Sequence, residues 1–434
     1  MTTPDPTGAR LGPLGVAASC LLLGLVALFA YAPIFAVDFF WHLKLGQLVA
    51  ETRSIPRTDL FSAVHPERSY VQFQWLWELL AYLAHRMGGL WGVRIMQVAW
   101  LTLSFAVLGT VGLRAFKSRA YAFFFCSLAL VLFEDRIQTR PSATALGFVA
   151  CMLPLWLEAE RQALRRVALY AFFVSCLWSN LHGGESLLAV LCMGALSLGR
   201  YLEGRVAAAR NGRARETLVL LCATCLGVLA SPTLIEGLRD WTWAIQPQLA
   251  SGNKEWRPTY TMLENGFTPS FLLIALSPTL VLLAYVLEQR RIARASAGAA
   301  PRPLAEWLLC GGLLVLSQQA VRNAFLCIVP LAFMLRRLDS ARVGPRTRRL
   351  LAVASLCLLL AAFHDHVVAG YGGIGEAAVL VADDLAPQTF PIELADFMQE
   401  AGIEGGVLND GRWGGYLIWR LWPMPTCLWT LATT

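Results

Sequence analysis

Long apolar runs separated by short polar connectors dominate the pattern along the chain. The runs lie near 11–35, 90–113, 119–133, 141–157, 167–181, 186–202, 217–231, 268–287, 304–320, 323–335 and 350–363. A helix crosses the bilayer core with roughly 20 apolar residues, and only helices or closed barrels satisfy their backbone there. Because these runs lack the alternation of barrel strands, the pattern predicts an all-α polytopic membrane protein with about eleven transmembrane helices.

The composition supports this fold class. Of the 434 residues, 56% are hydrophobic and only 15% are charged, and the mean hydropathy is +0.54. An ordinary soluble domain has roughly 25% charged residues, so a soluble enzyme and a disordered chain are both excluded. The formal net charge of +7 would suggest nucleic acid as a partner if the positions of the cations did not explain it.

The cations follow the order of the connectors. If the N-terminus lies in the cytoplasm, more than half of the 36 Lys and Arg residues fall on the inner side, as is typical of membrane proteins. The basic residues therefore indicate topology, and their partner is the anionic inner leaflet rather than nucleic acid. The inner connectors hold Arg114, Lys117 and Arg119; Arg161, Arg165 and Arg166; Arg200, Arg205, Arg210, Arg213 and Arg215; Arg290, Arg291, Arg294 and Arg302; and six arginines in 336–349.

The outer side then carries the long segments 36–89, 232–267 and 365–434, and long loops on a rigid scaffold usually carry function. In the first segment, 40–51 and 73–86 are predicted to be interfacial helices, because they are too short or too polar to span. The tail is predicted to contain helices at 391–401 and 412–421 and a strand at 405–408. We therefore expect a membrane domain, 1–364, and a partial α/β outer tail, 365–434.

Asp38 is the first candidate for chemistry, since it falls just past the outer end of the first apolar run. A carboxylate at this depth is costly and is usually functional or paired. The alternative is an acid at a helix boundary that pairs with Lys44 or Arg57.

Other polar groups fall on the same predicted face. The turn 179–185 combines a glycine pair with His182 and can present backbone N–H groups to an anion; alternatively it is a tight turn capped by Asn180. Arg322 occupies a very short outer turn, where its planar guanidinium suits a phosphate, although snorkelling to the interface would also place it there. Arg257 lies in the long segment 232–267.

The order of these motifs resembles that of bacterial members of the GT-C glycosyltransferase superfamily, relatives of the protein mannosyltransferases and the lipid A aminoarabinose transferases. The similar stretches are Asp38–His42 with Gly46, Ile55-Pro56-x-x-Asp59-x-Phe61-Ser62, Trp75-x-x-Glu78, Trp178–Gly184, Glu255-Trp256-x-Pro258, Arg322-Asn323, Phe390-Pro391 and Asn409–Leu417.

The resemblance implies transfer of a sugar from a polyprenyl-phosphate donor to a lipid, glycan or protein hydroxyl. The reaction would take place at the outer face of the bacterial inner membrane, with the N-terminus inside and the tail in the periplasm. It makes Asp38 the general base and assigns the site residues Asp59, Glu78, His42, Asn180, His182, Arg257 and Arg322, with the arginines and the Gly183–Gly184 amides near the departing phosphate.

The chain departs from the superfamily pattern in two respects. The superfamily often has an adjacent acidic pair, whereas Asp38 is flanked by Val37 and Phe39, so Asp59 or Glu78 would have to supply the second acid. Relatives also continue past Leu417 into a further outer domain, so we expect a truncated chain. A divalent metal is a further possibility, bound by His364-Asp365-His366 or by His42 with Asp38.

Two other classes of function stay open. A transporter or flippase would carry polar residues at mid-bilayer and often internal repeats, whereas the charges here gather at the outer rim. A non-catalytic scaffold or degenerate relative is the other alternative.

Overall fold

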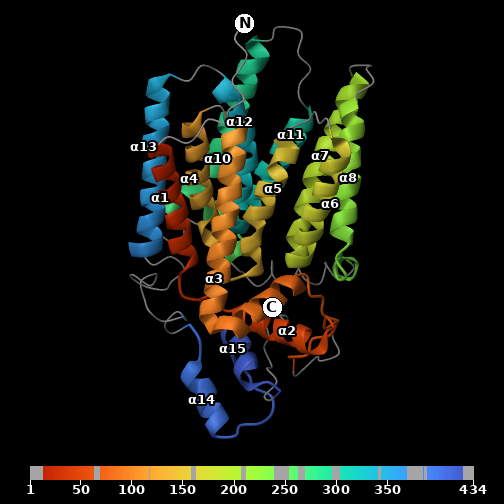
Figure 1. Ribbon diagram of the computed structural model, residues 1–434, viewed down its shortest axis with the longest axis vertical. Helices are drawn as coiled ribbons and strands as arrows, with labels where there is room; N and C mark the ends of the chain where they lie inside the picture. Colours follow the sequence, from red (N-terminus) through yellow and green to blue (C-terminus); the bar gives the residue numbers. More distant parts are fainter. Residues whose placement is uncertain are drawn as a thin grey trace.

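The computed structural model of the protein describes residues 13–62, 69–116, 118–157, 163–206, 212–238, 254–261, 269–295, 304–340, 344–368, 385 and 389–423. These residues form an elongated bundle of helices with further helices at one end (Figure 1). Within the described ranges there is no strand, only isolated bridges such as Ile34 to Leu385 and Thr58 to Ser69. The predicted helical fold class is thereby confirmed.

Each predicted apolar run overlaps a helix of the bundle. The bundle consists of α1 (Pro13–Ala30), α3 (Trp75–Ala115), α4 (Arg119–Phe133), α5 (Ala145–Leu157), α6 (Leu164–Leu181), α7 (Gly183–Val206), α8 (Gly212–Leu229), α10 (Pro269–Ala295), α11 (Leu304–Gln319), α12 (Ile328–Ser340) and α13 (Pro345–Phe363). Among the described residues, three helices are long and apolar enough to cross a membrane: Trp75–Ala115, Gly183–Arg205 and Pro345–Val367. Eleven crossings therefore stay a prediction.

The two helices predicted in the first outer segment lie at one end of the bundle. α2 (Phe39–Thr52) runs across that end (Figure 1). The predicted helix 73–86 forms the first turns of α3, which is interrupted at Gly88 and Gly89. Gly89 has a φ of 60°, a conformation that glycine adopts without the steric cost of a side chain. The interruption separates the first turns of α3, which pack against α2, from its apolar remainder.

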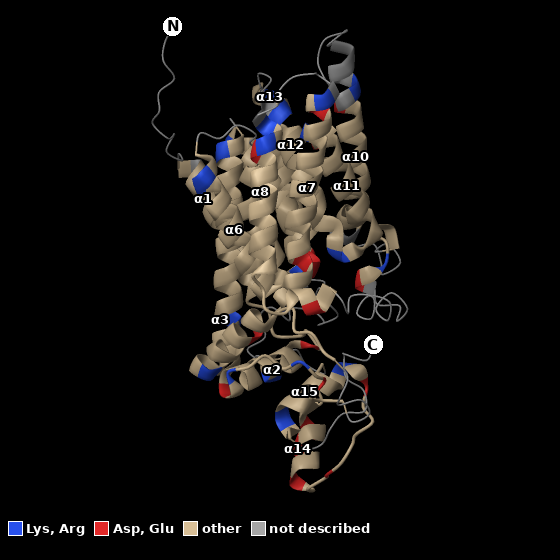
Figure 2. Ribbon diagram, turned by 90° about the vertical axis from the view of Figure 1, so that its right-hand side faces the viewer, with Lys and Arg blue, Asp and Glu red and all other residues tan. Residues whose placement is uncertain are grey.

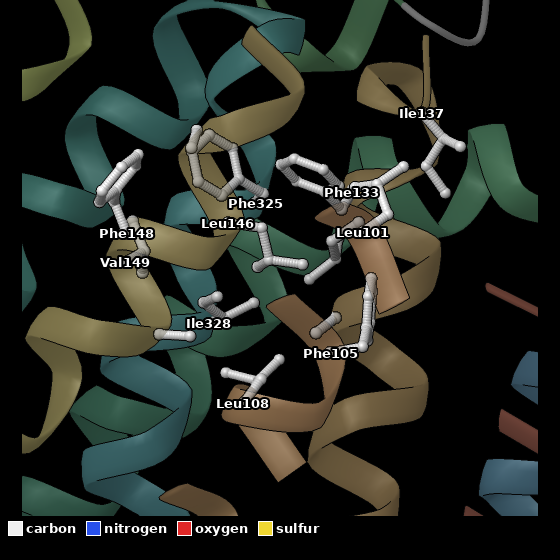
Figure 3. Packing of buried hydrophobic residues seen from close by; sticks show 14 of the residues in the cluster. Leu101, Phe105, Leu108, Phe133, Ile137, Leu146, Phe148, Val149, Phe325 and Ile328 are labelled. Atoms are coloured by element: carbon white, nitrogen blue, oxygen red, sulfur yellow. The ribbon is translucent and has the colours of Figure 1, made fainter. Parts of the chain in front are cut away.

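The core lies between the bundle helices and is built from large apolar side chains. Figure 3 shows the part where α3, α4, α5 and the segment 325–328 meet, with Leu101, Phe105, Leu108, Phe133, Leu146, Phe148, Val149, Phe325 and Ile328 buried. Elsewhere small residues let backbones approach: a Cβ at Gly199 would lie 2.2 Å from the Cα of Ala305 on α11. Such contacts are typical of helices that pack within a bilayer.

The tail differs from its prediction. The structure has helices α14 (Ile392–Glu400) and α15 (Gly411–Leu421) where helices were expected, but 405–408 is not a strand and only Val407 forms an isolated bridge. Gly402 and Gly405 have φ values of 61° and 103°, so the chain turns there and forms a connector instead. The remaining predicted tail, 369–384, 386–388 and 424–434, lies outside the described residues.

The two ends of the bundle differ in charge. α2, α14 and α15 lie at one end, and the start of α1 lies at the other (Figure 1). Lys and Arg positions are concentrated at the end where α1 starts, whereas both signs occur near α2 (Figure 2). This is the arrangement that the assignment of inner connectors requires, and the direction relative to a membrane stays a prediction.

Candidate active site

Asp38 precedes α2 and is bound by an arginine that the sequence analysis did not select. Its two carboxylate oxygens each accept a hydrogen bond of 2.9 Å from Nε of Arg140, and Oδ2 accepts another of 2.6 Å from Nη2. Arg140 stands just before the short helix η2 (Pro141–Thr144). Its Nη1 donates to Oε1 of Glu255 at 2.6 Å, on the short helix η3 (Lys254–Trp256). Arg140 therefore joins the outer segments 36–89 and 232–267.

His42 lies one helical turn after Asp38 and contacts a second carboxylate. Its Nδ1 is 2.8 Å from Oε1 of Glu78 on α3, and its Nε2 is 3.8 Å from Oδ2 of Asp38. The other Glu78 oxygen accepts a hydrogen bond of 2.7 Å from Gln72. Glu78 and Gln72 are fully buried. His42 thus lies between the carboxylates of Asp38 and Glu78, which come from distant parts of the sequence.

The charges around Asp38 and His42 fix their protonation. Burial would raise the pKa of Asp38, but the positive charges of Arg140 and His42 outweigh it and hold the pKa well below its usual range. Burial would lower the pKa of His42, but the neighbouring carboxylates of Asp38 and Glu78 raise that pKa to about 9. His42 is therefore an imidazolium at neutral pH.

The raised pKa of His42 predicts a loss of stability at alkaline pH. A group whose pKa is higher in the folded state stabilises that state fully below its unfolded pKa, near 6.5, and loses the contribution as pH rises through about 9. The thermal unfolding midpoint should fall across this window. Substitution His42→Gln should flatten the fall, measured on purified protein in detergent. The prediction is wrong if His42→Gln and the parent lose the same number of degrees between pH 6.5 and 9.

A second charged cluster surrounds the turn between α6 and α7. Arg136 and Arg322 both contact Glu185: the Nη1 atom of Arg136 donates to Oε1, and Nη2 of Arg322 lies 3.5 Å from the same oxygen. Nδ1 of His182 accepts a hydrogen bond of 3.3 Å from the Glu185 backbone N–H. Burial, reinforced by Arg322 and Arg136 against the opposing charge of Glu185, lowers the pKa of His182 to about 4. The neutral ring then carries its proton on Nε2.

The two clusters are connected. The guanidinium of Arg322 lies over the ring of Trp256, 4.5 Å from its centroid, and Trp256 follows Glu255, the partner of Arg140. Nε of Arg136 donates to the carbonyl oxygen of Arg322 at 2.6 Å. Asp38, His42, Glu78, His182 and Arg322 therefore belong to one network of buried or half-buried polar groups at the end of the bundle that carries α2.

Three predicted site residues have structural contacts instead. Asp59 Oδ1 accepts hydrogen bonds from the backbone N–H groups of Phe61 and Ser62 at 3.1 and 3.2 Å, so it shapes its own turn. Asn180 accepts a hydrogen bond from Trp75 Nε1 at 2.9 Å and donates to the Cys176 carbonyl at 2.8 Å.

Arg257 is exposed, and its carbonyl accepts from the Val321 N–H at 2.9 Å. The Gly183 N–H, expected to face an anion, donates to the Phe73 carbonyl at 2.7 Å. The two cations suggested as partners of Asp38 bind other residues instead. Arg57 pairs with Glu236, and Lys44 donates a hydrogen bond to Gln47.

Two arginines that join the network, Arg136 and Arg140, lie in the charged turn 134–140. Their spacing of four residues does not indicate which carboxylate each arginine binds. Glu185 and Glu255 stand inside motifs that were noted, Ser179–Glu185 and Glu255-Trp256-x-Pro258, but the sequence gives no reason to pair them with these arginines.

The residues suggested as metal ligands do not converge. His364 Nδ1 lies 2.9 Å from Oδ1 of Asp365, whereas the ring of His366 stacks on Phe29 with centroids 4.3 Å apart and its Nδ1 lies 3.6 Å from Oε1 of Glu134. Nδ1 of His42 is hydrogen-bonded to Glu78. In the part of the chain that the structure describes, no group of three His, Cys, Asp or Glu residues is placed to hold a metal ion. The residues present do not fit the expected metal.

Comparisons with known proteins add a structural neighbour. No family model matches the chain, and no curated protein matches it. Among solved structures, the chain is similar to ArnT from Cupriavidus metallidurans, whose crystal structure was determined bound to undecaprenyl phosphate. The identity is 15% and the TM-score 0.49, over 84% of this chain and 66% of the other. The chain thus spans just under two thirds of the neighbour's length, and no residue role is carried over from it.

Proposed function

We propose that this protein transfers a sugar from a polyprenyl-phosphate donor to an acceptor hydroxyl at the outer face of a membrane, with Asp38 as the general base. The observation that carries the proposal is the network around Asp38, which places one carboxylate beside Arg140 and, through Glu255 and Trp256, near Arg322. A lipid-linked donor needs such a site at a bundle end, where its chain stays in lipid and its phosphate reaches water.

The reaction balances with these groups. The carboxylate of Asp38 takes the proton of the acceptor hydroxyl as that oxygen bonds to the anomeric carbon. The bond from the anomeric carbon to the phosphate oxygen breaks, and polyprenyl phosphate leaves with the electron pair. Arginines near the departing oxygen stabilise the charge that develops there. Arg140 and Arg322 are the arginines that the network offers for this purpose.

Because each arginine of the network already pairs with a carboxylate, binding of the donor phosphate requires an additional step. The carboxylates of Asp38, Glu185 and Glu255 are matched by the guanidinium groups of Arg136, Arg140 and Arg322. A phosphate can bind strongly only if it displaces a carboxylate from an arginine. Displacement of Asp38 from Arg140 would return its pKa towards the usual range, and a base works best when its pKa is nearer the working pH.

The distribution of charge favours an enzyme over a transporter. A transporter is expected to place charged groups near the middle of its helices. Here the network lies at the bundle end that carries α2, and the pair formed by Glu306 and Arg337 belongs to helix ends of α11 and α12. The scaffold alternative predicts the same fold with no donor binding, so a binding experiment separates it from the proposal.

Binding of the donor's lipid phosphate tests the proposal. Native mass spectrometry of the purified protein with undecaprenyl phosphate and with undecaprenol should show a preference for the phosphate. Substitution Arg322→Lys keeps the charge but loses the planar fork, and it should weaken phosphate binding about 10-fold, as expected for a charged hydrogen bond. Arg337→Lys is the matched control, because Arg337 also pairs with a carboxylate but far from the network.

Equal binding of undecaprenol and undecaprenyl phosphate would contradict the proposal, and so would equal losses in the two Lys variants. If the protein prefers the phosphate, profiles of lipid-linked sugars from a deletion strain should identify the donor, because the unused donor should accumulate.

A further inference from the structure

The tail helix α15 rests directly on the turn that carries Asp38. A Cβ at Gly415 would lie 3.1 Å from the carbonyl oxygen of Val37 and 3.1 Å from the backbone nitrogen of Trp41. Val37 immediately precedes Asp38, and Trp41 belongs to the first turn of α2. The glycine therefore allows α15 to reach the backbone of α2, with no side chain between them.

Aromatic rings reinforce this contact. The ring of Phe40 packs against two tail residues, with its centroid 4.8 Å from that of Tyr416 and 5.1 Å from that of Phe390. Both arrangements are edge-to-face, a favourable geometry for aromatic pairs. Phe40, Phe390 and Tyr416 are buried, so the contact is part of the core rather than a loose surface touch.

α2 also makes contacts beyond its first turn, at Lys44 and Gly46. Trp419 of α15 lies beneath Lys44, whose Nζ is 5.8 Å from the ring centroid, and against His85 of α3 at 5.1 Å. On its other side α2 meets α3 at Gly46, where a Cβ would lie 2.0 Å from the carbonyl oxygen of Glu78. α2 is thus packed between the start of α3 and α15, with a glycine at each closest approach.

We propose that α15 is a positioning element of the candidate active site, and that Gly415 sets the distance at which Asp38 and His42 of α2 face Arg140 and Glu78. Gly415 touches neither substrate nor reacting atoms and acts through the backbone of Val37 and Trp41. The inference rests on the proposed function for its catalytic meaning, but the placement of α2 by α15 can be tested without any substrate.

Three glycine variants of α15 form a graded test. Gly415→Ala asks the first turn of α2 to move by a few tenths of an ångström, and Gly415→Val asks for more. Gly411→Ala is the matched control, because a Cβ there meets no atom within 4 Å. Hydrogen exchange followed by mass spectrometry should show amides of α2 exchanging about 10-fold faster in Gly415→Val, less in Gly415→Ala, and at the parent rate in Gly411→Ala.

Titration of His42 separates positioning from simple loosening of the tail. The groups that face His42 are Asp38 from its own helix and Glu78 from α3, with Arg140 beyond Asp38. If α15 places α2, the fall of the thermal midpoint between pH 6.5 and about 9 should shrink in Gly415→Ala and Gly415→Val. Loosening of α14 and α15 alone would lower the midpoint equally at every pH.

The outcomes distinguish the inference from the proposed function. Unchanged exchange in α2 together with an unchanged pH profile in both Gly415 variants would overturn the inference, whatever the protein binds. If exchange in α2 and the pH profile both change but the protein shows no preference for undecaprenyl phosphate, α15 still positions α2. The proposed function is then refuted. If Gly415→Val does not fold, Gly415→Ala still decides between these outcomes.

Discussion

Replacement of Asp38 by Asn is expected to lower the rate of sugar transfer at least about 100-fold while the protein still inserts and folds. The loss is that of a general base, which typically contributes 10²- to 10⁴-fold in rate. Asn keeps the size and the hydrogen-bonding shape of Asp but cannot take the proton of the acceptor. Folding should survive because Arg140 keeps a carboxylate partner, Glu255, after the change.

The measurement is the amount of glycosylated product restored in a deletion strain, normalised to the amount of protein in the membrane. Glu306→Gln is the control, since Glu306 is a half-buried carboxylate paired with Arg337 outside the network. It should restore glycosylation like the parent. A well-expressed Asp38→Asn protein that also restores it would refute the catalytic assignment and favour the scaffold alternative.

The sequence could predict the helices because their signal is local. An apolar run such as 90–113 needs no knowledge of its neighbours to be assigned to a helix, and α3 covers it. The same holds for α2, whose predicted bounds, 40–51, differ little from Phe39–Thr52. The error in the tail has a local cause too: apolar residues around 405–408 suggested a strand, but Gly402 and Gly405 bend the chain.

The partners of the polar side chains could not be predicted in this way. Asp38 has two cations close in sequence, Lys44 and Arg57, and pairing with one of them is the alternative that the sequence leaves open. The structure gives it Arg140 instead, 102 residues away, because the turn before η2 lies beside the start of α2. Which outer turns lie side by side depends on how the bundle helices pack, and apolar patterns do not specify that packing.

For Asp59, by contrast, the sequence suggested chemistry where the structure shows a local contact within a turn. It lies in a motif that resembles the superfamily's first outer loop, and a carboxylate in such a loop was assigned to chemistry. Its Oδ1 accepts two backbone hydrogen bonds within three residues, the ordinary role of Asp in a turn. Glu78 carries the better claim to be the second acid, because His42 links it to Asp38.

Gly46→Ala is expected to have the largest effect on folding and function among the glycine substitutions considered. A Cβ at this position would lie 2.0 Å from the carbonyl oxygen of Glu78 and 2.5 Å from its carbonyl carbon, which are backbone atoms of α3. Neither helix can turn a side chain aside to make room, so α2 must move away from α3. Overpacking of this kind costs about 1–3 kcal/mol.

The displacement should act on the site as well as on stability. His42 is one turn before Gly46 on α2, and its hydrogen bond to Glu78 spans the interface that would open. Gly46→Ala should therefore lower the thermal midpoint by several degrees and reduce transfer by at least about 10-fold, since misplaced catalytic groups lose rate steeply.

Gly24→Ala is the matched control, because Gly24 also lies within a helix, α1, but a Cβ there meets no atom within 4 Å. It should leave both the midpoint and the transfer rate at the parent values. If Gly46→Ala behaves like Gly24→Ala in both measurements, α2 does not approach α3 at Gly46 as described, and the pairing of His42 with Glu78 across that interface would have to be abandoned.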